Sequence, residues 1–257
     1  MSISASAIAS LRARTGVSIS ACKEALEEAG GDEEKAIELL RKRGLAQAAK
    51  KAAREQAEGL AFVAESGNKV AVVLLRCETD FVARDDNFQK TGKEIADALL
   101  NGGESAAKAK AEALVPELVQ KLGENITVGE LHLVEGSTIG SYLHSNAKIA
   151  VVVALDGGSK DQARDAAMHA AAASPKVVSP DEVDAAMVEK EKEIWREQLK
   201  NEGKPEAMWD KIMMGKEKKF REESALLKQA FVKDPSQTVE QYLAGAKVTK
   251  YVRVSVA

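Results

Sequence analysis

Residues 69–88 read KVAVVLLRCETDFVARDDNF, a stretch that changes from strand character to helix character. The run over residues 69–75 is apolar and rich in β-branched side chains, which favours a strand. Asp86 or Asn87 is placed to cap a helix over residues 88–100. We therefore predict a strand and a helix that are joined by a short connection at the surface.

Two apolar residues, Phe81 and Val82, lie in this connection. Irregular backbone is rarely buried, because its polar groups would lose their hydrogen-bond partners. One interpretation is that Phe81 is exposed to solvent. The other is that it folds back and packs in the core, and the residues alone favour neither.

The strand sequence is repeated later in the chain. KVAVV at residues 69–73 recurs as KIAVV at residues 148–152. Each copy follows a strand that starts with glycine, Gly59 or Gly140, and a turn, and each copy leads to a helix. We therefore predict an α+β fold with two related subdomains, each a small antiparallel sheet covered by helices. Their predicted residues are 59–138 for the first and 139–179 with 224–257 for the second.

The first 44 residues predict three short helices. Ser18 is placed to cap the second helix, Asp32 lies at the start of the third, and Gly44 follows the third as a stop. Helices of this size suggest a UBA-like three-helix module over residues 1–44. The alternative is an ordinary small bundle without a partner.

Residues 45–58 are rich in alanine, lysine and arginine and predict a helical linker. In the first interpretation its basic residues Lys50, Lys51 and Arg54 form a solvated face. In the second they contact nucleic acid, as they would in an RNA-associated chaperone.

A highly charged segment, residues 180–223, interrupts the second subdomain. More than half of its residues are charged, which is too many for a segment inside a core. Gly203 and Pro205 supply a helix stop and a new first turn, so we predict an inserted α-helical hairpin. Apolar residues at near-helical spacing either hold its two helices together or form a contact surface: Val183, Met187, Ile194, Trp195, Leu199, Met208, Trp209, Ile212, Met213 and Phe220.

Composition limits the class of protein. The chain has 257 residues, of which 45% are hydrophobic and 30% charged, so it has enough apolar residues for a core and enough charge for solubility. Its net charge of −3 argues against direct nucleic-acid binding through bulk charge. The two cysteines, Cys22 and Cys77, are too few for a disulfide framework. No apolar run is long enough for a membrane span, so we expect a cytoplasmic protein with no membrane contact.

The residues predict no catalytic or metal site. His132, His144 and His169 are scattered, and no histidine or cysteine lies at metal-ligand spacing. His169 lies in an alanine-rich helix, where a structural role is expected. The segment Gly157-Gly158-Ser159-Lys160 lacks the spacing of a phosphate-binding loop. We therefore expect no enzyme activity, no metal and no cofactor, and a protein that acts by binding.

Thr79-Asp80-Phe81-Val82 after a Val/Leu strand resembles the signature of the bacterial translation elongation factor Ts family. The resemblance extends in family order from residue 4 to the end of the chain. The other matching motifs are LRARTG at 11–16, CKEAL at 22–26, GENI at 123–126, GSY at 140–142, MHAA at 168–171 and PSQTV at 235–239.

This resemblance implies a guanine nucleotide exchange factor that promotes GDP release from the GTPase elongation factor Tu. It implies that Phe81 inserts near the magnesium and phosphate site of the GTPase, with Thr79, Asp80 and Val82 beside it. It further implies GTPase contacts by the N-terminal module and by the body of the protein, through Arg12, Ile19, Ile126 and His144. In some members the inserted hairpin supports a homodimer.

One alternative function stays open. The chain could be a non-exchanging protein–protein adaptor, with the three-helix module and the charged hairpin holding different partners.

Several family members continue past the last strand into a further helical module, whereas this sequence ends at Val256-Ala257. The residues do not decide whether that module is absent from the lineage or has been removed.

Overall fold

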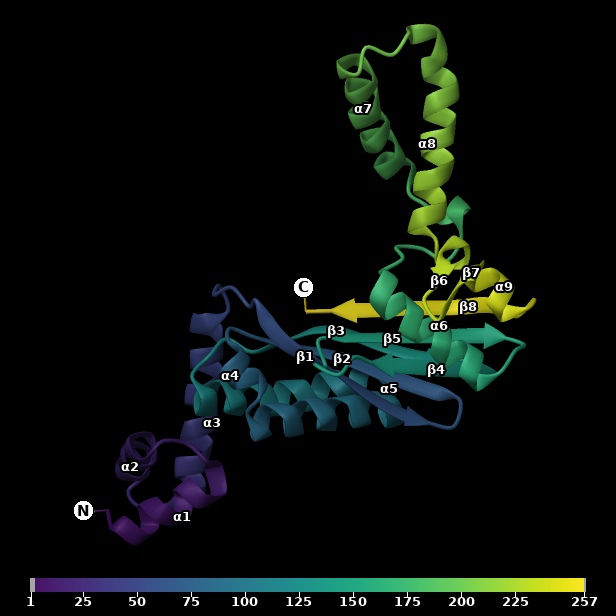
Figure 1. Ribbon diagram of the computed structural model, residues 1–257. Helices are drawn as coiled ribbons and strands as arrows, with labels where there is room; N and C mark the ends of the chain where they lie inside the picture. Colours follow the sequence, from purple (N-terminus) through teal and green to yellow (C-terminus); the bar gives the residue numbers. More distant parts are fainter. Residues whose placement is uncertain (1–2, 257) are drawn as a thin grey trace. The chain divides into compact units, whose positions relative to one another are not determined.

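The computed structural model describes residues 3–256 and has an α+β fold, as predicted (Figure 1). The chain divides into two compact units. The first contains the described residues up to Leu133, Leu143–Ala150 and the end of the chain from Val254. The second contains Val134–Tyr142 and Val151–Arg253.

Three helices begin the first unit: α1 (Ala5–Thr15), α2 (Ile19–Glu28) and α3 (Glu33–Lys51). Each N-terminus is capped by the side chain of the preceding residue, Ser4, Ser18 or Asp32, which accepts a hydrogen bond from a backbone N–H of the first turn. The caps fix where the helices begin, and a small aliphatic core holds them together. That core contains Leu11, Val17, Cys22, Ala25, Leu26, Ala36 and Leu40.

The predicted helix end at Gly44 is wrong, because α3 continues through this glycine to Lys51. Gly44 is needed for packing. A Cβ atom at this position would lie 2.9 Å from the backbone oxygen of Pro116, so glycine lets α3 approach the helix that carries Pro116. A glycine inside a helix lowers its intrinsic stability, and the close contact between the helices explains why it is tolerated here.

The first sheet contains β1 (Glu58–Ser66), β2 (Lys69–Cys77) and β3 (Thr127–Glu135), in the order β1-β2-β3. The first two strands form an antiparallel hairpin that pairs Ser66 with Lys69 and leaves a two-residue turn. Gly67 in this turn has a φ of +60°, a conformation that glycine adopts without strain. The turn therefore fixes the register of the stretch that carries the candidate site.

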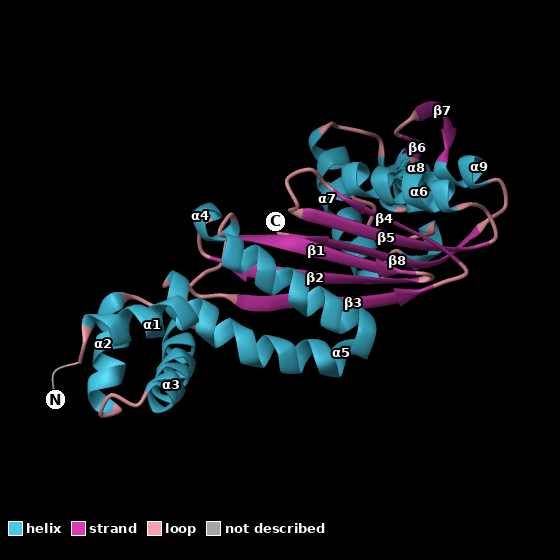
Figure 2. Cartoon of the chain, turned by 90° about the horizontal axis from the view of Figure 1, so that it is seen from below, coloured by secondary structure: helices cyan, strands magenta, loops and turns pink. Residues whose placement is uncertain are grey.

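Helix α5 (Asp86–Leu122) covers this sheet and folds back on itself at Gly103, whose φ and ψ are not helical (Figure 2). Lys121 donates to Asn87 at 2.6 Å, so the two arms run antiparallel. The predicted helix over residues 88–100 corresponds to the first arm. The predicted start is two residues late, because Asp85, and neither Asp86 nor Asn87, caps the helix.

The second sheet contains β4 (Thr138–Leu143), β5 (Ile149–Asp156) and β8 (Lys247–Ser255), in the order β4-β5-β8. Helix α6 (Lys160–Ala173) has a buried, alanine-rich face and starts with a reciprocal capping box between Ser159 and Gln162. A two-stranded ribbon, β6 (Ala230–Phe231) and β7 (Asp234–Thr238), precedes α9 (Val239–Leu243). Pro235 and Ser236 lie in β7, and Thr238 caps the helix that follows.

His169 is a structural residue, as expected. Its ring is 1% exposed, its Nδ1 accepts from the backbone N–H of Val232 at 3.1 Å, and its Nε2 lies 2.9 Å from Oε1 of Gln229. Since Nδ1 accepts, Nε2 carries the proton and donates to Gln229. Burial lowers the pKa of His169, which favours this neutral form.

The charged segment forms the short 3₁₀ turn η1 (Pro180–Glu182), then α7 (Ala185–Asn201), the 3₁₀ turn η2 (Glu206–Met208) and α8 (Trp209–Ser224), and α7 and α8 contact each other (Figure 1). Another 3₁₀ turn, η3 (Leu226–Lys228), follows. Trp195 packs edge-on against Phe220 with ring centroids 5.9 Å apart, so this tryptophan belongs to the seam between the helices. Other apolar residues stay outside it, including Ile194, Met208 and Met214.

Candidate functional site

The residues after β2 form a short helix, α4 (Asp80–Ala83), where only a connection was predicted. Phe81 in this helix is 80% exposed, so the interpretation that it folds back into the core is wrong. Its neighbours Val82 and Ala83 are buried. The turn is thus fixed to the body on one side and presents a single aromatic side chain on the other.

Thr79 caps α4, and a distant glutamate holds Thr79. The Thr79 hydroxyl accepts from the backbone N–H of Val82 at 3.4 Å. Glu124, which follows α5, accepts from the backbone N–H groups of Glu78 and Thr79 at 3.0 Å each, and also from the Thr79 hydroxyl. Hydrogen bonds to a charged acceptor are among the stronger ones in proteins, so Glu124 restrains the backbone that enters α4.

Glu78 makes the reciprocal contact. Its Oε1 accepts from the backbone N–H of Asn125 at 2.6 Å and from the guanidinium of Arg54 at 3.3 Å. These two donors lower the pKa of the Glu78 carboxyl, the Asn125 N–H most strongly. Asn125 is buried, and its side-chain amide donates to the backbone oxygen of Arg54 at 2.8 Å. Arg54 therefore has a structural partner, which weakens its predicted role as part of an RNA contact.

Asp80 and Cys77 flank the exposed phenylalanine in the sequence but differ in their surroundings. Asp80 forms an ion pair with Arg84 at 2.8 Å, and both side chains are solvent-accessible. Cys77 is buried, its thiol donates to the backbone oxygen of Thr79, and burial raises its pKa to about 12. A thiol with so high a pKa is not a nucleophile at neutral pH. The turn therefore has the character of a binding surface.

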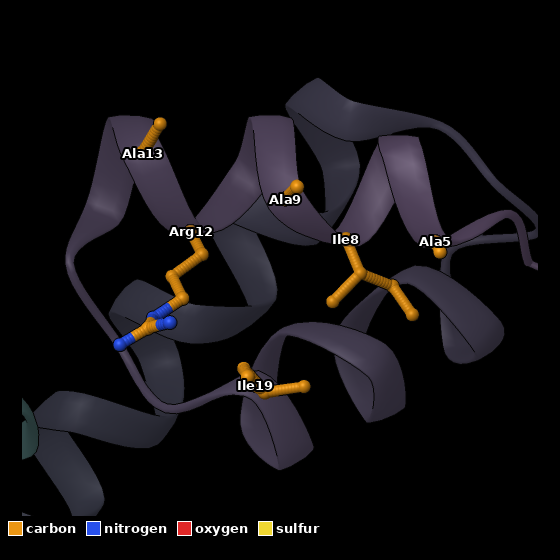
Figure 3. Close-up of a pocket in the computed structure, with 6 residues that line it drawn as sticks. All are labelled: Ala5, Ile8, Ala9, Arg12, Ala13 and Ile19. Carbon is orange, nitrogen blue, oxygen red and sulfur yellow. The ribbon is translucent and has the colours of Figure 1, made fainter.

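A second surface lies between α1 and α2, where Ala5, Ile8, Ala9, Arg12, Ala13 and Ile19 line a shallow apolar groove. The side chains of Ile8 and Arg12 extend from α1 toward the start of α2, where Ile19 lies (Figure 3). Ile19 is 57% exposed. Among the residues that the structure describes, Arg12 makes no ion pair, so its charge stays available beside an apolar patch.

The two remaining predicted contacts, Ile126 and His144, differ in exposure. Ile126 is 2% exposed and packs in the core beneath the first sheet, so it offers no side-chain surface. His144 lies in the turn between β4 and β5, where its Nδ1 is 3.1 Å from Oδ1 of Asn146. The same turn contacts β1, because the backbone N–H of Ala61 donates to the oxygen of Ala147 at 2.7 Å.

The described geometry offers two binding surfaces, the turn that presents Phe81 and the groove between α1 and α2. Within residues 3–256 no group of three or more histidine, cysteine or acidic side chains is arranged to hold a metal ion. No helix in that range combines the length and the apolar character that a membrane span requires.

The sequence did not predict the supporting roles of Glu78, Glu124 and Asn125. The motif GENI at residues 123–126 contains two of them and was noted only as part of a resemblance. Glu124 lies 45 residues from Thr79 in the sequence, so no local pattern connects the two.

The family model and three curated relatives that match this chain carry the name elongation factor Ts. A family model described as elongation factor TS matches residues 78–257. The elongation factor Ts of Idiomarina loihiensis is 44% identical over 268 residues, covering 100% of this chain and 91% of the relative. The corresponding protein of Marinobacter nauticus is 46% identical over 262 residues, covering 99% and 91%. That of Hydrogenovibrio crunogenus is 44% identical over 273 residues, covering 100% and 92%.

Proposed function

The chain belongs to the elongation factor Ts family, and from this premise we propose that it promotes GDP release from the translational GTPase elongation factor Tu by inserting Phe81 near the magnesium and phosphate site. It acts by binding, without a cofactor or a bond-making step. Its place of action is the cytoplasm, where translation elongation occurs.

The observation that carries the proposal is the exposure of Phe81 on an otherwise anchored turn. An exposed aromatic ring contributes little burial free energy to the free protein, and its surface is available to a partner. A buried phenylalanine covers about 150–250 Å². At about 25 cal/mol per Å², that area corresponds to about 4–6 kcal/mol before ordering costs.

For nucleotide exchange, this binding free energy must differ between the nucleotide-free and the GDP-bound form of the GTPase. A protein that binds the nucleotide-free GTPase more tightly than the GDP-bound form must weaken GDP binding by the same factor, because binding free energies are linked. A shift of 10³- to 10⁴-fold needs about 4–6 kcal/mol. One phenylalanine that fits only the nucleotide-free form is therefore of the right magnitude, with Thr79, Asp80 and Val82 as its immediate neighbours in the contact.

The alternative is an adaptor that binds without causing exchange. Titration calorimetry separates the two, because an exchange factor binds nucleotide-free elongation factor Tu at least about a thousandfold more tightly than the GDP-bound form. An adaptor binds both forms equally, and equal affinities would exclude the proposed function.

The groove of the N-terminal helices supplies a second GTPase contact in this proposal. We take the three helices as a UBA-like module that presents Arg12 and Ile19 to a helix of the partner, since the groove is apolar and its lining includes the guanidinium of Arg12. Ile126 and His144 are the body contacts that the family resemblance implies. Of these two, the partly exposed His144 is the better candidate, because Ile126 is buried.

We expect the double substitution of Arg12 and Ile19 by alanine to weaken binding to elongation factor Tu by about tenfold, the effect of losing contacts worth about 1.4 kcal/mol. Calorimetric titration measures this affinity. Lys35→Ala serves as control, because Lys35 lies on α3 and pairs with Asp32 on the surface. Equal affinities of the double variant and the parent would exclude the groove as a contact.

The two-helix segment between the core elements is proposed as an inserted hairpin that forms a homodimer. Support comes from its exposed apolar residues, among them Ile194 at 50% and Met214 at 74%. Ile194 also lines a shallow pocket with the ring of Trp209. Side chains of this kind on a highly charged hairpin are typical of a contact surface.

We expect the parent protein to be a dimer at micromolar concentration and Ile194→Glu to be a monomer, because a charge in an apolar contact is strongly unfavourable. Light scattering gives the mass of each. Val232→Glu places the same charge on another exposed apolar position of the second unit and should leave the dimer intact. A monomeric parent protein would refute the homodimer.

A further inference from the structure

We propose that Glu124 is a positioning residue for nucleotide exchange, whose carboxylate holds the turn that presents Phe81. This inference rests on the proposed function, and it assigns a role to a side chain outside the Thr79–Val82 motif. The starting observation is that Phe81 is exposed although the turn that carries it is anchored. Phe81 has almost no packing of its own, so the backbone of its turn must fix its direction.

Glu124 fixes that backbone directly. Its Oε2 accepts both consecutive N–H groups that lead into α4, those of Glu78 and Thr79. Its Oε1 accepts the hydroxyl proton of Thr79, which leaves the Thr79 oxygen lone pairs free to accept from the Val82 N–H. The carboxylate therefore restrains both the main chain before α4 and the side chain that caps it.

A second set of bonds closes the arrangement from the other side. Glu78 accepts from the N–H of Asn125, the residue after Glu124, so the two segments hold each other reciprocally. Asn125 is buried and also bonds to the backbone oxygen of Arg54, in the segment after α3. Glu124 thus lies next to a residue that hydrogen bonds tie to two other segments of the first unit, so its carboxylate can support the neighbouring turn.

Such a support matters for exchange because ordering a side chain on binding lowers affinity. A turn that is already held in its bound conformation loses less freedom when it meets the GTPase. Without Glu124 the turn would sample other conformations, and only the fraction with Phe81 correctly placed would be competent to bind. The maximal rate of stimulated GDP release would fall even though Phe81 itself is unchanged.

Glu124→Gln tests the proposal, because glutamine has nearly the same shape but only one acceptor oxygen. Its amide nitrogen is a donor and would face either the two N–H groups or the Thr79 hydroxyl. We expect hydrogen exchange of the Glu78 and Thr79 amides to accelerate at least about tenfold, with the amides of β1 and β2 unchanged. The maximal rate of GDP release should fall about tenfold, which corresponds to about 1.4 kcal/mol.

Glu130→Gln is the matched control. It makes the same substitution and the same change of charge in the first unit, at a surface glutamate whose carboxylate contacts His132. It should leave both the amide exchange and the GDP-release rate at parental values. Thr79→Val is a second test variant for the amide measurement, because it removes the hydroxyl that donates to Glu124 and caps α4 but leaves both N–H bonds to the carboxylate. We expect hydrogen exchange of the Glu78 and Thr79 amides to accelerate less than in Glu124→Gln.

The two measurements keep the possible failures apart. Unchanged protection of the Glu78 and Thr79 amides in Glu124→Gln would overturn the holding role. Loss of protection with a parental GDP-release rate would overturn the role in exchange. If the parent protein itself fails to accelerate GDP release, the proposed function fails, while the amide measurement still decides whether Glu124 holds the turn. A lower rate in Glu130→Gln as well would indicate a general charge effect and would also overturn the assignment.

Discussion

Phe81→Ala should reduce stimulated GDP release by about a thousandfold, because it removes most of an aromatic contact worth about 4–6 kcal/mol before ordering costs. The fold should stay intact. Phe81 is 80% exposed in the free protein, and the packing of α4 depends on Val82 and Ala83. The measurement is the rate of labelled GDP release at saturating concentrations of the variant, together with its thermal midpoint.

Leu45→Ala is the control for this prediction. Leu45 is another large apolar side chain of the first unit that is more than half exposed, and it lies outside both candidate surfaces. Its variant should accelerate GDP release like the parent. A Phe81→Ala protein with a parental melting temperature and a parental release rate would refute the insertion of Phe81.

Gly140→Ala should lower the free energy of unfolding of the second unit by about 2–3 kcal/mol, the usual effect of forcing extra volume into a packed site. A Cβ atom at Gly140 would lie 2.3 Å from the backbone nitrogen of Arg164 and 2.7 Å from the carbonyl carbon of Ala163. Both are main-chain atoms of α6, so no side-chain rotation relieves the clash. The helix would have to move away from β4.

Urea unfolding followed by circular dichroism measures this loss. Gly215→Ala is the matched control, since Gly215 lies inside α8 with nothing within 4 Å of its added Cβ atom. That variant should be more stable than the parent by about 0.5–1 kcal/mol, because alanine is the better helix former. An unchanged midpoint for Gly140→Ala would mean that α6 and β4 do not pack as closely as the structure has them.

Local patterns predicted the elements of this fold well. The repeat at residues 69–73 and 148–152 corresponds to the central strands of the two sheets, and the α+β class follows from it. Capping residues such as Ser18 and Asp32 located helix starts, because a cap is a contact within four residues. Gly44 misled the prediction because its role is a contact with Pro116, which a local pattern does not reveal.

The candidate site could be predicted from the sequence less completely than the fold. The apolar residues Phe81 and Val82 in a predicted surface connection drew attention to Thr79–Val82. Only the structure excludes the interpretation that Phe81 packs in the core. Ile126 was expected at the surface from a resemblance, although it packs in the core beneath the first sheet. Glu124 escaped notice because its three hydrogen bonds reach across 45 or 46 residues of sequence.

The most direct test is the release of fluorescently labelled GDP from elongation factor Tu in a stopped-flow experiment, with and without the parent protein. Our account predicts that release accelerates with the concentration of the protein and saturates, and that substoichiometric amounts discharge the whole GTPase pool when unlabelled GDP is in excess. A release rate that stays at its spontaneous value while the two proteins bind each other would contradict it.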